Sequence, residues 1–114
     1  MAKAAVLDEV RENLTLELRR GALVVAVLAS LRDEEYGYSL KTNMAAGGVD
    51  IDEGTLYPLL RRLESQGLLS SRWVLGDGRP RRYYKLNALG ERLLKDLSAE
   101  WRQLSAGLDR LLRR

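Results

Sequence analysis

The stretch from Asp52 to Leu68 constrains the fold of this chain more than any other part of its sequence. Leucines recur in it at positions i, i+3, i+4 and i+7, a spacing that places them on one face of an α-helix packed against a core. These residues are Leu56, Leu59, Leu60 and Leu63. Asp52 suits the N-cap, and Gly67 suits the left-handed conformation that ends a helix. The pattern predicts an amphipathic helix over 52–66, which Pro58 is expected to bend because it removes one intrahelical hydrogen bond.

A β-hairpin is predicted directly after this helix. Two runs rich in β-forming residues, 68–75 and 81–86, flank the turn Gly76-Asp77-Gly78, a spacing typical of a hairpin. The tip and the return strand carry basic residues interleaved with tyrosines, which puts positive charge where a loop can reach a phosphate backbone. These residues are Arg79, Arg81, Arg82, Tyr83, Tyr84 and Lys85. A helix followed by a basic hairpin is the outline of a winged helix.

The composition excludes several kinds of site. At 114 residues the chain is one domain by size and short for an enzyme with a deep cleft. It contains no cysteine and no histidine, which removes disulfides, thiolate nucleophiles, imidazole bases and the usual zinc sites. There is also no phosphate loop and no nucleophile with a base. We therefore expect a protein that is not an enzyme and holds neither a metal ion nor a cofactor.

Charge and hydropathy indicate where the positive potential lies on the chain and in which cellular compartment the protein is expected. The net charge is only +3, but the hairpin is locally basic while residues 50–53 are acidic, so the positive potential is expected to be local to the hairpin. The longest apolar run, residues 21–31, is about half the ~20 residues that span a bilayer. No signal-peptide cleavage pattern is present. These features predict a cytoplasmic protein without membrane contact.

The order of the remaining elements completes a winged helix-turn-helix. Residues 2–12 read as a short helix, with Asn13 or Thr15 as a cap for the next helix, although one continuous helix is an alternative. Residues 14–31 are apolar almost all round in their second half, as in the central helix of a small domain. A short helix over 39–46 ends at Gly47-Gly48 and precedes the 52–66 helix. The predicted fold is mainly α with a small β-hairpin, and the 52–66 helix is the second of the helix-turn-helix pair.

The segment 87–114 predicts a long dimerisation helix. Its leucines and one tryptophan recur every three or four residues, and a helix of this length would be roughly 40 Å long, beyond the span of so small a domain. Its distal half must bury apolar side chains against a second copy of the chain, with the 2–12 helix adding its own apolar face. The predicted interface residues are Val6, Val10, Leu97, Trp101, Leu104, Leu108 and Leu111. The predicted division is a dimerisation helix over 1–13, a DNA-binding domain over 14–86 and a second dimerisation helix over 87–114.

The predicted DNA contacts lie on the 52–66 helix, the hairpin and the Tyr36-Gly37-Tyr38 step. The helix would offer side chains to base edges and phosphates, and the hairpin would reach phosphates or the minor groove. The residues are Tyr38, Thr55, Tyr57, Arg61, Arg62, Arg79, Arg81 and Arg82. The alternative for the helix residues is a solvated face, and for Tyr38 it is packing on the first helix. Strand alternation sends Arg81 and Arg82 to opposite faces, so only one of them need face DNA, and one of the two neighbouring tyrosines is expected in the core.

Two alternatives stay open for function. The acidic residues 50–53 precede the helix that would enter the major groove, and this favours a winged-helix module that binds a protein partner without sequence-specific DNA binding. For Trp101, one interpretation is an anchor in the centre of a dimer interface. The other is a platform on which a ligand stacks, and the two are compatible because an incompletely filled interface is also a pocket.

Four segments together resemble the PadR family of bacterial transcriptional regulators, over roughly residues 17–95. They are LRRGALVVAVL, the Tyr36-Gly37-Tyr38 step, GTLYPLLRRLESQGLL and GRPRRYYKLNALGERLL. With one helix after the wing, the chain resembles the small subfamily that includes multidrug-responsive repressors. The resemblance implies a winged helix-turn-helix dimer that binds a roughly palindromic operator in double-stranded DNA and represses transcription until a small aromatic or hydrophobic effector changes its shape.

The same resemblance assigns a role to Trp101. In the multidrug-responsive type, a tryptophan of the C-terminal helix lines a cavity at the dimer centre and stacks on flat aromatic compounds, and Trp101 occupies the corresponding place. The chain departs from the commoner Ser-Pro-Gly-Thr-Leu-Tyr pattern because Asp52-Glu53 precedes Gly54. These two negative charges stand at the base-facing start of the helix, so the family's usual operator sequence does not carry over.

Overall fold

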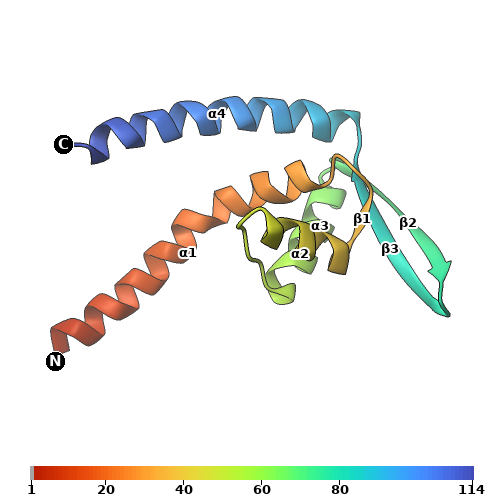
Figure 1. The fold of residues 1–114 in the computed structure, drawn as a ribbon, viewed down its shortest axis with the longest axis horizontal. Coiled ribbons are helices and arrows are strands. Elements are labelled where there is room, and N and C mark those ends of the chain that lie inside the picture. The colour runs from red at the N-terminus through yellow and green to blue at the C-terminus, as the bar shows by residue number, and fades with distance from the viewer. Residues whose placement is uncertain (1) are drawn as a thin grey trace.

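The computed structural model describes residues 2–114 as a small helical core from which two long helices and a β-hairpin project (Figure 1). The elements follow the order helix, strand, helix, helix, strand, strand, helix. Their bounds are α1 Ala2–Ser30, β1 Glu35–Tyr36, α2 Gly37–Ala46, α3 Glu53–Ser65, β2 Leu69–Gly76, β3 Arg79–Leu86 and α4 Ala88–Leu112. This is a mainly α winged helix-turn-helix with a long C-terminal helix, which confirms the predicted fold class.

Helix α1 is continuous, so the predicted break near residue 13 is wrong and the single-helix alternative is correct. Asn13 and Thr15 lie on an exposed part of α1, and neither side chain forms a capping hydrogen bond. An asparagine or threonine inside a helix costs only about 0.5 kcal/mol relative to alanine, which the neighbouring helix-forming residues offset. The predicted boundary between residues 13 and 14 therefore falls inside a helix.

The helix-turn-helix pair is α2 and α3, and the ends of α3 are those that its sequence predicts. The Asp52 carboxylate accepts the Thr55 N–H at 3.1 Å, and Gly67 has φ +81°. The four leucines of α3 are all buried, as their helical spacing predicts. Helix α2 begins two residues earlier than expected, because Ser39 already lies in its first turn, where its hydroxyl accepts the Tyr36 N–H at 3.1 Å.

The wing is a tight hairpin within a three-stranded antiparallel sheet of order β1-β3-β2. Asp77 and Gly78 both have positive φ, 52° and 77°, as a two-residue type I′ turn requires. Strand β3 begins at Arg79 and not at residue 81, and includes Pro80. Since β1 pairs only with Tyr83 and Tyr84, Pro80 lies where β3 has a neighbour on one side, and no ladder hydrogen bond is lost.

Helix α4 is fastened to the core at its first turn. Asn87 caps it by accepting the Gly90 N–H at 2.9 Å and donates from Nδ2 to the Gly67 carbonyl at 2.8 Å. Gly90 is buried against the backbone of Leu68. Further along α4, Leu94 is buried and Leu97 packs, half-buried, against the same core. Leu97 was expected in a dimer interface, but it contacts the chain's own core because the first half of α4 runs beside α1.

Candidate nucleic-acid interface

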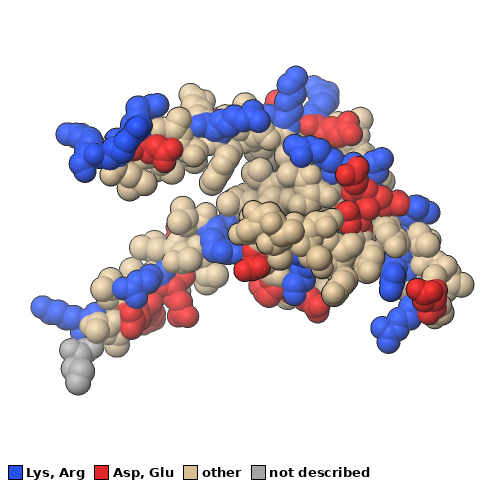
Figure 2. Space-filling view, in the orientation of Figure 1, with Lys and Arg blue, Asp and Glu red and all other residues tan. Residues whose placement is uncertain are grey.

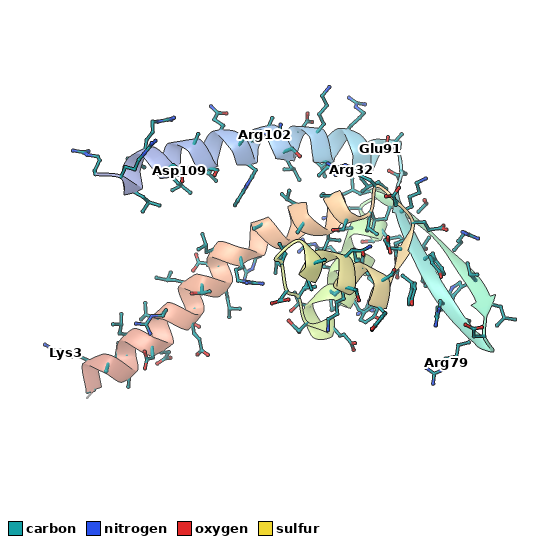
Figure 3. The ribbon with its side chains drawn as sticks, viewed as in Figure 1. Lys3, Arg32, Arg79, Glu91, Arg102 and Asp109 are labelled. Atoms are coloured by element: carbon teal, nitrogen blue, oxygen red, sulfur yellow. The ribbon has the colours of Figure 1, made fainter. Side chains whose placement is uncertain are left out.

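The solvent-facing side of α3 is polar because its leucines occupy the opposite side. Thr55, Arg61 and Arg62 are exposed, and Tyr57 is partly so. Figure 3 shows that side chains of the wing and of the long helices also point outward from the core, and Arg79 extends from the tip of the hairpin. A helix with one buried apolar face and a free polar face fits the geometry of a recognition helix.

The first turn of α3 is ordered by Asp52 and Thr55. The Thr55 hydroxyl donates to Asp52 Oδ1 at 2.8 Å, while the Thr55 N–H binds the other carboxylate oxygen. The hydrogen bond from the Thr55 side chain holds the pKa of Asp52 below its usual value. Asp50 contributes its backbone carbonyl, which accepts from Arg19 at 2.6 Å. Part of the acidic 50–53 segment thus has a structural role within the chain, and replacing Thr55 would disturb this cap as well as any base contact.

A tyrosine on α3 fixes the start of α2. The Tyr57 ring lies so close to the buried Gly37 that a Cβ at residue 37 would overlap its hydroxyl group. Beside this contact, Tyr38 is 72% exposed and its ring stacks on Tyr36 with centroids 6.4 Å apart. Tyr38 therefore does not pack on α1 and holds its hydroxyl in solvent at the N-terminus of α2.

The wing arginines have different surroundings, as strand alternation predicts. Arg79 is exposed at the tip. Arg81 is half-buried, with its guanidinium 4.6 Å from the centroid of the Tyr36 ring. Arg82 points to the other face, where it forms an ion pair with Glu64 of α3 at 2.9 Å. Sequence reasoning missed this glutamate, because no periodicity relates two residues on different elements.

The two tyrosines of β3 divide in the same way. Tyr84 is buried at the edge of the core, and this burial raises the pKa of its phenol, although the nearby charge of Arg82 opposes the shift. Tyr83 is half-buried on the opposite face, with its ring centroid 5.3 Å from that of Tyr36. The expectation that one of this pair belongs to the core is confirmed for Tyr84.

The adjacent arginines of α3 also face in different directions. Arg62 lines a cleft of about 850 Å³ between α1 and the start of α3, together with Arg19, Arg20 and Lys41. Arg61 lies on the side of the wing, near enough to Tyr84 for its charge to lower the pKa of that phenol against the larger effect of burial. Of the two, Arg61 is the one whose charge acts on a residue of the wing.

The free positive charge of the wing is smaller than its sequence suggests and is concentrated toward the tip. Arg72 forms a two-point ion pair with Glu34, with nitrogen–oxygen distances of 2.6 and 2.7 Å. Arg82 is paired with Glu64, whereas Arg79, Arg81 and Lys85 have no carboxylate partner among residues 2–114. Figure 2 shows blue side chains beside a red acidic group at the end of the hairpin, where Asp77 occupies the turn. Arg79 and Arg81 are thus the unpaired cations near the tip, whereas Lys85 lies opposite Ser70 near the base.

The two long helices leave apolar side chains uncovered where they diverge (Figure 1). On α1 they include Val6 and Val10, and on the distal half of α4 they include Trp101, Leu104, Leu108 and Leu111. Trp101 is 46% exposed. Within residues 2–114, no helix is long and apolar enough to cross a membrane, and no group of acidic side chains is arranged to hold a metal ion.

Comparison with known proteins gives consistent matches over most of the chain. The model of the transcriptional regulator PadR-like family matches residues 27–96. A transcriptional regulator of Mycobacterium tuberculosis is 37% identical over 81 residues, which cover 70% of this chain and 76% of that protein. The crystal structure of a PadR family transcriptional regulator from Eggerthella lenta aligns with TM-score 0.83 and 46% identity over 95% of this chain and 96% of the other. A PadR-like transcription factor from Bacteroides fragilis aligns with TM-score 0.73 and 35% identity over 87% and 98% of the two chains.

Proposed function

Because the chain belongs to the PadR-like family of transcriptional regulators, we propose that it is a cytoplasmic homodimer that binds a two-fold symmetric operator and represses transcription until a planar hydrophobic ligand releases it. The observation that carries the proposal is the free polar face of α3 beside unpaired arginines of the wing. In this mode α3 lies in the major groove, with Thr55, Tyr57 and Arg61 toward base edges and phosphates. Arg79 reaches the backbone beside it.

The flanks of α3 offer further contacts. Tyr38 stands at the N-terminus of α2, where its exposed hydroxyl is free to donate to a phosphate. Arg81 would approach the same strand with its guanidinium held over Tyr36. Arg62 lines the cleft between α1 and α3, so it would contact DNA along the border of that cleft. Arg82 is the exception among the arginines expected at DNA, because Glu64 already neutralises it.

The dimer is proposed from the uncovered apolar faces of α1 and α4. A single chain leaves these side chains in water, whereas a two-fold interface would bury them against their own copies. Charge supports the same pairing, since carboxylates of α1 could meet arginines from the end of the partner's α4. The carboxylates are Glu9, Glu12 and Glu17, whereas Asp8 is already paired with Arg11 at 2.6 Å. The arginines are Arg110, Arg113 and Arg114. Such a dimer would hold two α3 helices about one turn of DNA apart, roughly 34 Å.

Operator binding is tested by footprinting DNA around the encoding gene and by titrating salt. We expect protection of two half-sites about 10 bp apart, with affinity that falls steeply as salt rises. Arg79→Ala should weaken binding to all sequences alike and lower the salt slope by about 1.8, because the dimer loses two phosphate contacts, one per protomer. Arg72→Ala is the matched control: its charge is already paired with Glu34, so the slope should stay unchanged. Equal affinity for every duplex would refute sequence-specific regulation.

Ligand release is proposed from the position of Trp101 on the uncovered face of α4. Two copies of this ring would come together near a two-fold axis, and a ligand between them acts by favouring one spacing of the α3 helices over another. A planar cationic dye should quench the fluorescence of Trp101, measured in Trp73→Phe to remove the second indole, and should displace the operator. Trp101→Ala should abolish both effects. A dye that binds without competing with DNA would contradict control by ligand.

A further inference from the structure

Three side chains tie the recognition helix to both strands of the wing. Arg82 of β3 donates from Nη2 to Glu64 Oε1 of α3 at 2.9 Å and from Nε to Ser71 Oγ of β2 at 3.1 Å. The Ser71 hydroxyl donates in turn to Glu64 Oε2. Both carboxylate oxygens are therefore occupied, one by each strand. We refer to Glu64, Ser71 and Arg82 as the helix–wing clamp.

Two aromatic rings hold the guanidinium of the clamp in place. The Arg82 guanidinium carbon lies 5.6 Å from the centroid of the Trp73 ring and 5.6 Å from that of Tyr84. The strand register explains this arrangement, because Trp73 is the cross-strand partner of Arg82 and Tyr84 is that of Ser71. The Arg82 side chain is only 39% exposed and that of Glu64 only 26%. Arg82 is thus a neutralised and partly covered cation.

The clamp lies where a small change in the angle between the wing and α3 would move the tip of the wing by a large distance. Outside the clamp, α3 is joined to β2 through the short link at residues 66–68. Leu69, Tyr84 and Leu86 also pack the base of the wing into the core that contains the α3 leucines. The clamp adds the polar contacts between α3 and the wing. At about 3.3 Å per residue an eight-residue strand is about 26 Å long, so a tilt of about 10° at its base would move the tip by roughly 4–5 Å. A displacement of that size would separate Arg79 from the phosphate it reaches when α3 lies in the groove.

We propose that Arg82 is a positioning residue, which through Glu64 and Ser71 sets the angle of the wing to the recognition helix and does not itself contact phosphate. The inference rests on the proposed DNA-binding function and deepens it. It reverses the expectation from sequence, in which Arg82 was one more basic contact of the wing. It also gives Glu64 a role that favours DNA binding although its charge is negative.

Whether Glu64→Ala raises or lowers operator affinity distinguishes a positioning role of Arg82 from direct contact with a phosphate. Removing a negative charge near DNA and freeing an arginine would raise affinity if Arg82 could bind phosphate. If Arg82 positions the wing through the clamp, Glu64→Ala lowers operator affinity by about fivefold at 0.15 M salt, because the tip loses its phosphate contact. The matched control is Glu91→Ala, which removes a carboxylate from the first turn of α4, outside α3 and the clamp, and its affinity does not fall. Higher affinity in Glu64→Ala would overturn the proposal.

A double-mutant cycle with Arg79 gives a second criterion. If the clamp acts by placing the tip, Arg82→Ala has no further effect once Arg79 is alanine, and the salt slope of the double variant equals that of Arg79→Ala alone. If Arg82 contacts a phosphate itself, the two losses add and the slope falls by about a further 1.8, for one contact in each protomer. Additive losses would therefore also overturn the proposal.

Hydrogen exchange of the free protein tests the clamp without DNA. Glu64→Ala and Arg82→Ala should each speed exchange of the amides in residues 69–86, whereas Glu91→Ala should leave them as in the wild type. Unchanged exchange in both clamp variants would refute the clamp even if the wild type binds its operator. Failure of the wild type to prefer any sequence would instead refute the proposed function, and the exchange data would still decide whether the clamp orders the wing.

Discussion

Leu108→Asp is expected to convert the proposed dimer to monomers that remain folded and no longer bind the full operator at micromolar concentration. Leu108 is 41% exposed in the single chain and lies beyond the part of α4 that contacts its own core, so the substitution leaves that core intact. In a two-fold interface the aspartate is buried twice. An unpaired buried charge costs about 3 kcal/mol or more, so dimerisation should weaken by roughly 10⁴-fold. Light scattering measures the mass, and circular dichroism checks the fold.

Leu89→Asp supplies the matched control for this experiment. Leu89 is also on α4 and is 52% exposed, but it lies in the first turn, far from the distal apolar stripe, where a carboxylate is favoured by the helix dipole. This variant should stay dimeric and bind the operator normally. A monomeric wild type, or a dimeric Leu108→Asp, would contradict an interface along the distal half of α4. Operator half-sites would then need another means of pairing.

The sequence predicted those parts of the fold in which neighbouring residues decide the structure. The leucine spacing of α3 and the Asp77-Gly78 turn are local signals, and both elements form where they were expected. Strand β1 was missed because two residues, Glu35 and Tyr36, are too few to show alternation. It exists only because β3 lies beside it. The false break in α1 comes from a local signal that did not decide the structure. Asn13 is a residue type that can cap a helix, but the helix-forming residues on both sides continue α1 through it.

The candidate site shows the same limit more sharply. Composition placed several basic residues in the hairpin, but it did not reveal that Glu34 neutralises Arg72 or that Glu64 neutralises Arg82. These partners are separated by 38 and 18 residues, so neither helical nor strand periodicity relates them. The arginines of a wing are equivalent in sequence and become different only when other elements fold against them. An electrostatic argument from sequence alone therefore overstates the charge that the wing offers to DNA.

The junction of α4 with the core is a second place where a long-range contact decides the role of a residue. Gly90 lies in the first turn of α4, where glycine is normally unfavourable by about 1 kcal/mol relative to alanine. Its Cα approaches the backbone of Leu68, and an added Cβ would overlap the Leu68 carbonyl oxygen and lie 3.0 Å from Leu86 Cδ2. Neither the carbonyl nor the leucine can retreat easily, because Asn87 N–H also binds that carbonyl. The contact sets how closely α4 follows the core.

Gly90→Ala is therefore expected to destabilise the protein by about 2–3 kcal/mol despite the better helix propensity of alanine. Gly21→Ala is the matched control, since Gly21 also lies inside a helix but a Cβ there meets nothing within 4 Å. It should stabilise the protein by up to about 1 kcal/mol. Denaturant unfolding at equal protein concentration measures both, because the stability of a protein that forms the proposed dimer would depend on concentration. If the two substitutions change the free energy of unfolding in opposite directions, the close approach to Leu68, and not helix propensity, selects glycine at residue 90. A stabilising Gly90→Ala would instead mean that α4 can shift along the core without loss of stability.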